Sequence, residues 1–249
     1  MVTADPLAPL ALLPGVEEAL GEARAAVDTL LGHRLLRRRS AELSAEAGLR
    51  CARASAALAG HEVSLAQLRD GVEDPVVQGA VRVSTGLGPL VDVVDRAPLQ
   101  ALARLHVLAA RGIADDDDLG RPRAVGSVGS RLAGLADLIA ERKTSSALLL
   151  SAVVQGELLT LDAFPVAGDV VARAASRLVL VARGLDPKAV SCPDVGHAER
   201  AAEYVAGAAG YREGDVGAWV VHCCEAVRLG AVESLAICEA LLRDAETTT

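Results

Sequence analysis

The sequence predicts an all-α protein, a helical bundle with at most a short β-hairpin flap. Apolar residues recur at helical spacing along nearly the whole chain. No segment shows the sustained period-2 alternation of β-branched and aromatic residues that is typical of strands. Hydrophobic residues make up 51% of the 249 positions, and much of that share is alanine, a strong helix former.

Five helices are predicted before the middle of the chain. Gly60 is a natural C-terminal stop for one of them. Ser64, followed three residues later by Gln67, is a candidate capping box. Pro75 suits the first turn of the next helix. The predicted ranges are Val16–Leu36, Glu42–Gly60, Ser64–Gly71, Pro75–Val94 and Pro98–Ala110.

The segment Gly112–Ser130 is the main break, and any hairpin flap is expected there. It contains the acidic run Asp115–Asp118, which we interpret as a solvated loop because nothing fixes the geometry of a metal site. Two further loops are expected at Phe164–Asp169 and Asp186–Asp194. The helices predicted after the break are Arg131–Ala140, Ser145–Leu161, Val170–Arg183, Ala198–Ala209 and Gly217–Leu242.

Composition argues against several functions. Aromatic residues are only 2% and the net charge is −8, which disfavours a nucleic-acid partner. The five cysteines form no C-x-x-C pair, so we expect buried thiols and a cytoplasmic location rather than a disulfide framework. No apolar run reaches the roughly 18–20 residues needed to span a bilayer, so no membrane insertion is expected. No metal or other cofactor is predicted.

The segment from Asp162 to Arg173 reads Asp-Ala-Phe-Pro-Val-Ala-Gly-Asp-Val-Val-Ala-Arg. Anchored on Phe164, the only phenylalanine, it resembles the Fic/DOC family motif H-P-F-x-(D/E)-G-N-G-R-x-x-R. Gly168 then stands for the motif asparagine and Arg173 for its last arginine. The other equivalences are losses. They place Asp162 at the histidine, Val166 at the acidic residue, Asp169 at the second glycine and Val170 at the first arginine.

Other segments resemble the family in the same order over roughly residues 98–228. The run Leu102–His106 resembles an L-x-x-L-H helix, and Gly120–Arg123 resembles a G-x-x-R segment. Tyr204 and Trp219 fall where the family places aromatic residues in its last helices. The arginine-rich, alanine-rich composition suits a high-GC, actinobacterial type. The resemblance implies a Fic-like core at 98–249 after an N-terminal helical region at 1–97.

The N-terminal region also resembles a self-inhibitory helix of the family, with the pattern (S/T)-x-x-x-E-(G/N). Ser55 and Gly60 match its ends, and Ala59 stands where the glutamate should be. In the family, that glutamate pairs with the last motif arginine and blocks productive placement of the ATP phosphates. Ala59 offers no carboxylate for this pairing.

The resemblance assigns chemistry to positions that have changed here. In the family the histidine is the general base, and losing a positioned base costs about 10²–10⁴ in rate. The acidic residue holds Mg²⁺, and Val166 cannot. Of the positions named, only Gly168 and Arg173 remain as candidates for nucleotide contact. We therefore expect a degenerate, inactive Fic-fold protein that acts by binding an unknown protein partner or ligand, with self-association left open.

Two alternatives stay open at this point. One is a divergent Fic-type transferase that moves AMP or a phosphoryl group to a protein hydroxyl, with Asp162 and Arg173 in the active site. The other is a helical interaction module unrelated to Fic. In the favoured interpretation, Asp162 simply ends one helix. Asp169 is expected to cap the helix that starts at Val170 and to pair with Arg173 across its first turn.

Overall fold

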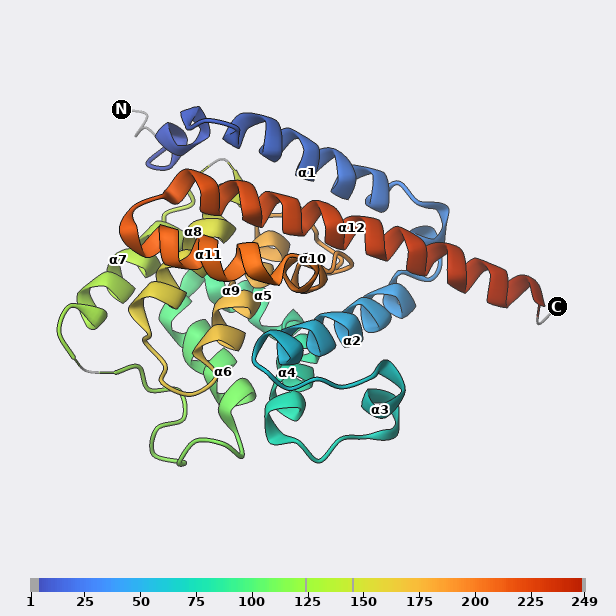
Figure 1. Cartoon of the computed structure of the whole chain (residues 1–249), viewed down its shortest axis with the longest axis horizontal. Coiled ribbons are helices and arrows are strands. Elements are labelled where there is room, and N and C mark those ends of the chain that lie inside the picture. The colour runs from blue at the N-terminus through green and yellow to red at the C-terminus, as the bar shows by residue number, and fades with distance from the viewer. Residues whose placement is uncertain (1–4, 124, 145, 248–249) are drawn as a thin grey trace.

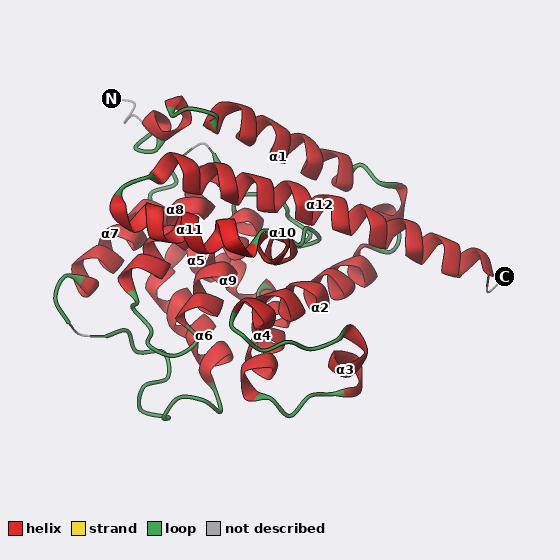
Figure 2. Cartoon of the chain, in the orientation of Figure 1, coloured by secondary structure: helices red, strands yellow, loops and turns green. Residues whose placement is uncertain are grey.

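The computed structural model describes residues 5–123, 125–144 and 146–247, and Figure 2 shows only helices and loops there. The α-helices are α1 Val16–Leu31, α2 Ser40–Leu58, α3 Leu65–Asp70, α4 Pro75–Thr85, α5 Val91–Arg96, α6 Pro98–Ala110, α7 Val128–Ala140, α8 Ala147–Leu161, α9 Gly168–Ala182, α10 Pro193–Glu199, α11 Ala201–Glu213 and α12 Val216–Thr247. Short 3₁₀ turns are η1 Ala8–Leu12, η2 Arg34–Arg37 and η3 Gly88–Leu90. The all-α prediction is confirmed.

Local signals in the sequence set several helix boundaries. The Ser64 hydroxyl accepts a hydrogen bond from the Gln67 amide, and the Gln67 side chain accepts one from the Ser64 amide, which completes the capping box. Asp74 caps α4 by accepting from the Val76 amide at 2.9 Å. Gly60 ends the turn after α2 with φ of +89°, a conformation that suits glycine.

Several expected boundaries were wrong. The helix predicted over Val16–Leu36 ends at Leu31, and a separate 3₁₀ turn follows it. The helix predicted over Pro75–Val94 ends at Thr85, because the run Gly86-Leu87-Gly88-Pro89 interrupts it and Pro89 has no amide hydrogen to donate. The loop predicted to run through Asp194 ends earlier, since Pro193 opens the short helix α10. Helix α11 starts only at Ala201, after a break at Arg200.

The segment Gly112–Ser130 is an irregular loop until α7 begins at Val128. Among the described residues it contains no hairpin. Within the described part of this segment, the strand-like geometry is limited to an isolated bridge between Arg111 and Ala114. Asp115–Asp118 is exposed, as expected of a solvated loop. Ser145, the first residue of one predicted helix, lies outside the described residues.

Helices α8 and α9 pack against each other at the centre of the molecule, and the other helices surround them (Figure 1). Helix α1 lies along α12, so elements from near the two ends of the chain are neighbours (Figure 1). One large hydrophobic core includes Val27 and Leu43 as well as Leu150 and Trp219. The division into residues 1–97 and 98–249 stays a prediction.

The five cysteines are unpaired and buried, as the sequence suggests. No helix within the described residues is both long enough and apolar enough to cross a bilayer.

Candidate functional site

The loop between α8 and α9 carries the Fic-like motif, and two left-handed residues shape it. Asp162 closes α8 with φ of +44°, and Ala167 opens α9 with φ of +56°. Ala167 stands at the first glycine of the family motif. An alanine in this conformation is strained by about 1–2 kcal/mol relative to right-handed backbone. The loop therefore keeps a turn that glycine would form at less cost.

His106 of α6 contacts this loop and holds it in place. Its ring stacks on the buried Phe164 ring with centroids 4.5 Å apart. Its Nδ1 accepts from the Gly120 amide at 2.9 Å, so its Nε2 carries the proton and donates to the Val166 carbonyl at 3.1 Å. Burial lowers the pKa of His106 and keeps the ring neutral. His106 thus ties the motif loop to the loop that follows α6.

Arg173, the last motif arginine, is buried, with only 1% of its side chain exposed. Its Nε donates to the Ser55 hydroxyl at 3.0 Å, and its Nη1 donates to the Tyr204 hydroxyl at 3.2 Å. Its Nη2 donates both to the Ser55 carbonyl and to Asp169 Oδ2, each at 2.9 Å. Every nitrogen of the guanidinium group is engaged within the protein.

A buried carboxylate lies beside this arginine. Asp194 of α10 has Oδ1 3.8 Å from Arg173 Nε and Oδ2 3.6 Å from Arg177 Nε. Burial acts against the pKa of Arg173, but Tyr204, Asp169 and Asp194 outweigh it and raise that pKa. Burial also acts against the pKa of Arg177, but neighbouring groups that include Asp194 outweigh it and raise that pKa. The two arginines therefore remain charged around one shared carboxylate.

Helix α10 can carry Asp194 this deep because it lies backbone-to-backbone on α12. A Cβ atom at Gly196 would lie 2.2 Å from the carbonyl oxygen of Ala226, so only glycine fits. This close contact also places His197 in the interior.

The predicted contact between Asp169 and Arg173 is present, but the predicted capping role of Asp169 was wrong. The N-cap of α9 is Ala167, which makes no side-chain capping bond, and Asp169 lies inside the first turn. Its carboxylate turns toward Arg173 because the buried cation attracts it more strongly than a free backbone amide would. The N-terminus of α9 thus has a negative charge where an anion would otherwise be stabilised.

The inhibitory-helix-like segment does reach this site. Ser55, on the last turns of α2, contacts Arg173 through both its hydroxyl and its carbonyl oxygen. Ala59 is the C-cap of α2, and Gly60 follows in a left-handed turn. Ser55 has the close contact with the arginine for which the family uses a glutamate at the Ala59 position.

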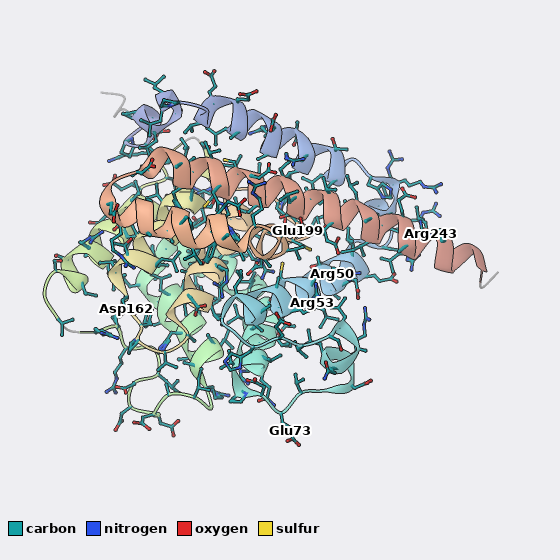
Figure 3. The ribbon with its side chains drawn as sticks, viewed as in Figure 1. Arg50, Arg53, Glu73, Asp162, Glu199 and Arg243 are labelled. Atoms are coloured by element: carbon teal, nitrogen blue, oxygen red, sulfur yellow. The ribbon has the colours of Figure 1, made fainter. Side chains whose placement is uncertain are left out.

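Asp162 lies apart from the buried network. Its Oδ2 pairs with Arg123 Nη2 at 3.0 Å, and both side chains are largely exposed. Figure 3 shows Asp162 at one side of the molecule, away from Arg53 on α2. Gly168 is the first residue of α9, and a Cβ atom there would make only an ordinary 3.8 Å contact with Phe164. Glycine is therefore not required by space at this position.

The motif positions do not fit a Mg²⁺ ion. Val166 has no oxygen in its side chain, and its carbonyl already accepts from His106. Across the part of the chain that the structure describes, no group of three or more His, Cys, Asp or Glu side chains could hold a metal. The donor set needed to hold a divalent ion against a phosphate is missing here.

Beyond Arg173, buried polar groups form a chain that the sequence did not reveal. Burial raises the pKa of the Tyr204 phenol, while Arg173, which donates to its oxygen, and the nearby Gln155 oppose that rise. Gln155 Nε2 lies 3.2 Å from His197 Nε2, and His197 Nδ1 lies 3.0 Å from His222 Nε2. One signal could have pointed to buried charge: Arg173 and Arg177 stand one turn apart on an otherwise apolar helix.

The same architecture is found in solved structures. A Fic family protein from Desulfovibrio desulfuricans G20 is similar with a TM-score of 0.76 and 18% identity over 90% of this chain and 75% of that one. A fragment of Fic-1 from C. elegans is similar with a TM-score of 0.73 and 17% identity, covering 90% of this chain and 73% of its own. No family model and no curated protein matches the sequence. The chain therefore has the Fic fold.

Proposed function

We propose that this protein is a degenerate Fic-fold protein that transfers no nucleotide and acts by binding another protein. One observation carries the proposal: the guanidinium of Arg173 is buried and bonded at every nitrogen to Ser55, Asp169 and Tyr204. A phosphate that used this arginine would have to displace these groups.

A phosphate could bind Arg173 only by replacing the present hydrogen-bond partners of its guanidinium group. Hydrogen bonds to a charged group contribute about 1.5–3 kcal/mol each, and freeing Arg173 would leave buried acceptors on Ser55 and Tyr204 without a donor. A phosphate would also approach Asp169. Two unit charges of the same sign about 4 Å apart repel by roughly 4 kcal/mol at an effective dielectric near 20. Gly168 and Arg173 therefore offer a poor nucleotide site.

The alternative, a divergent AMP or phosphoryl transferase, needs Asp162 as a base and Arg173 as a phosphate ligand. Asp162 is paired with Arg123 at the surface, and Arg173 is enclosed at the opposite end of the motif. These placements favour the binding function over transfer. The third candidate, a helical module unrelated to Fic, is set aside because the likeness to Fic structures spans 90% of the chain.

The test is transfer of labelled AMP from ATP, with Mg²⁺ or Mn²⁺, to the protein itself and to the proteins of a bacterial lysate. We expect no label above the level of a heat-denatured sample. Asp162→Ala is the matched variant, because it removes the one carboxylate that could act as base and lies at the surface. Strong labelling by the native protein that disappears in Asp162→Ala would refute the proposal.

The same proposal includes a cytoplasmic location, an unknown protein partner and self-association. A protein that works by binding should keep its activity in cells when the motif carboxylate is removed. Complementation with Asp162→Ala therefore separates the two functions, because a transferase would lose its effect and a binding protein would not.

A further inference from the structure

A groove of about 680 Å³ opens between α1, α11 and the first half of α12, and no motif residue lines it. Its volume is typical of sites for small ligands. The lining is mainly apolar and includes the small residues Ala19, Ala206 and Ala218. The groove is therefore shaped for a compact molecule rather than filled by side chains of the chain itself.

One polar group faces the groove from the interior. His222 lines it, yet the residue is only 8% exposed. Its Nε2 lies 3.0 Å from His197 Nδ1, while Nδ1 of His222 has no hydrogen-bond partner within the described residues. A ring nitrogen without a protein partner can exchange a hydrogen bond to water for one to a ligand. This nitrogen is thus ready for a ligand atom.

The direction of the hydrogen bonds along the buried polar chain determines whether His222 Nδ1 donates or accepts. That direction is set at Gln155, whose amide nitrogen can only donate. The Gln155 amide nitrogen then donates to His197 Nε2. His197 consequently has its proton on Nδ1 and donates to His222 Nε2. His222 must keep its proton on Nδ1, so the groove receives a neutral N–H donor.

Both histidines stay neutral in this arrangement. Burial and the neighbouring charge of His222 and Arg173 lower the pKa of His197 well below its usual value. Burial, with Arg200, lowers the pKa of His222 to about 4, against the opposing effect of Glu203 and Glu225. The Nδ1–H group of His222 is therefore an uncharged donor, and a hydroxyl or carbonyl oxygen is a suitable acceptor for it.

The rim of the groove is acidic. Glu18 and Glu22 lie one turn apart on α1, and neither forms a close ion pair or hydrogen bond within the described residues, although Glu22 interacts electrostatically with Arg228. Like charges at this spacing destabilise a helix by about 0.2–0.5 kcal/mol. The other charges on the rim, apart from Asp215, form the pairs Arg200–Glu203 and Arg228–Glu225. Five carboxylates line the groove against two arginines, and this excess of negative charge favours a cation.

We propose that this groove binds a small organic ammonium compound that also carries a hydroxyl or carbonyl acceptor. The ammonium group would lie near Glu18 and Glu22, and the acceptor would receive the Nδ1 hydrogen of His222. The apolar lining would contact the carbon skeleton between them. Amino sugars and amino alcohols have this chemistry. The inference is independent of whether the motif loop is catalytic.

Calorimetric titration with three probes tests the two halves of the inference. Glucosamine has both a cation and acceptors, 1,4-diaminobutane has only the cations, and glucose has only the hydroxyl groups. Glucosamine should bind at least about tenfold more tightly than either of the others, a difference of about 1.4 kcal/mol. Failure of glucosamine to saturate below about 10 mM, or equal binding of all three, would overturn the proposal.

The variants are chosen to keep the fold. Glu18→Gln with Glu22→Gln should reduce glucosamine affinity at least about tenfold, because both changes lie on the exposed rim. Glu17→Gln with Asp28→Asn, on the same helix but outside the groove, changes the net charge equally and should leave affinity unchanged. Equal loss in both double variants would reduce the effect to general electrostatics and refute the site. Binding of a lysine-rich peptide in the absence of glucosamine binding would also refute it.

Discussion

Arg173 illustrates what can be inferred for a single residue. The spacing of four residues suffices to predict its contact with Asp169, and the structure has that contact at 2.9 Å. The contacts with Ser55, 118 positions earlier, and with Tyr204 depend on the tertiary fold. Periodicity cannot supply such long-range partners. The resemblance to an inhibitory helix points to the correct segment of α2, although Ala59 lacks the carboxylate.

The first prediction concerns Asp169. Asp169→Asn should lower the free energy of unfolding by about 1–2 kcal/mol, because a charge-assisted bond to a buried cation becomes a neutral one. Asp162→Asn is the matched control, since its pair with Arg123 is exposed and should contribute less than about 1 kcal/mol. Urea denaturation measures both. Equal effects of the two changes would show that Asp169 does not hold Arg173.

The second prediction concerns Asp194. Asp194→Asn should destabilise the protein by about 3–5 kcal/mol, because it leaves Arg173 and Arg177 buried near each other without their shared counter-charge. Thermal unfolding followed by circular dichroism is the measurement. A change below about 1 kcal/mol would mean that the two arginines are compensated by other groups.

At the scale of elements, the motif loop has a left-handed turn, with φ of +56°, at a position where the family motif has glycine and this chain has alanine. The sequence predicts the flanking helices α8 and α9 to within a few residues. It misses the break after α4, since the apolar periodicity continues on both sides of Gly86–Pro89. It also misses α10, because Pro193 and Gly196 are typical of loops.

The third prediction follows from that turn. Ala167→Gly should raise the free energy of unfolding by up to about 1 kcal/mol, because relief of the left-handed strain outweighs the greater entropy that glycine gives the unfolded chain. Ala209→Gly, on the exposed face of α11, is the control and should lower stability by about 0.5–1 kcal/mol. Urea denaturation of the two variants should therefore shift in opposite directions. A loss of stability in Ala167→Gly would contradict the described turn.

For the whole molecule, the sequence predicts the fold class, and the structural likeness over 90% of the chain confirms it. The order of the Fic-like segments stays a prediction. The sequence does not reveal the buried polar chain from Arg173 to His222. His197 and His222 are 25 positions apart, and Gln155 is 42 positions before His197, so only packing of α8, α10 and α12 brings them together.

The fourth prediction uses these buried histidines. The pKa of His222 is lowered to about 4 by burial, so between pH 6.5 and 4 the unfolded chain binds more protons than the folded protein. Stability should therefore fall as pH falls through this range, with His222 alone contributing a loss of about 2 kcal/mol at pH 5. His197 and His106, whose pKa values are also lowered by burial, act in the same direction.

Urea denaturation at pH 7, 6 and 5 measures this dependence. The loss between pH 7 and 5 should be smaller in His222→Gln, which keeps a polar group beside His197 and cannot take up a proton in this range. A free energy of unfolding that stays level or rises toward pH 5 would show that these rings are not held neutral.

The central claim is that Arg173 serves the protein's own interior rather than a nucleotide. Isothermal titration with ATP and Mg²⁺ tests it most directly. The native protein should give no saturable binding up to about 1 mM ATP. Asp169→Gly, which removes the repelling carboxylate, should bind ATP at least as well as the native protein. Tight, saturable binding of ATP to the native protein that is lost in Asp169→Gly would contradict the account.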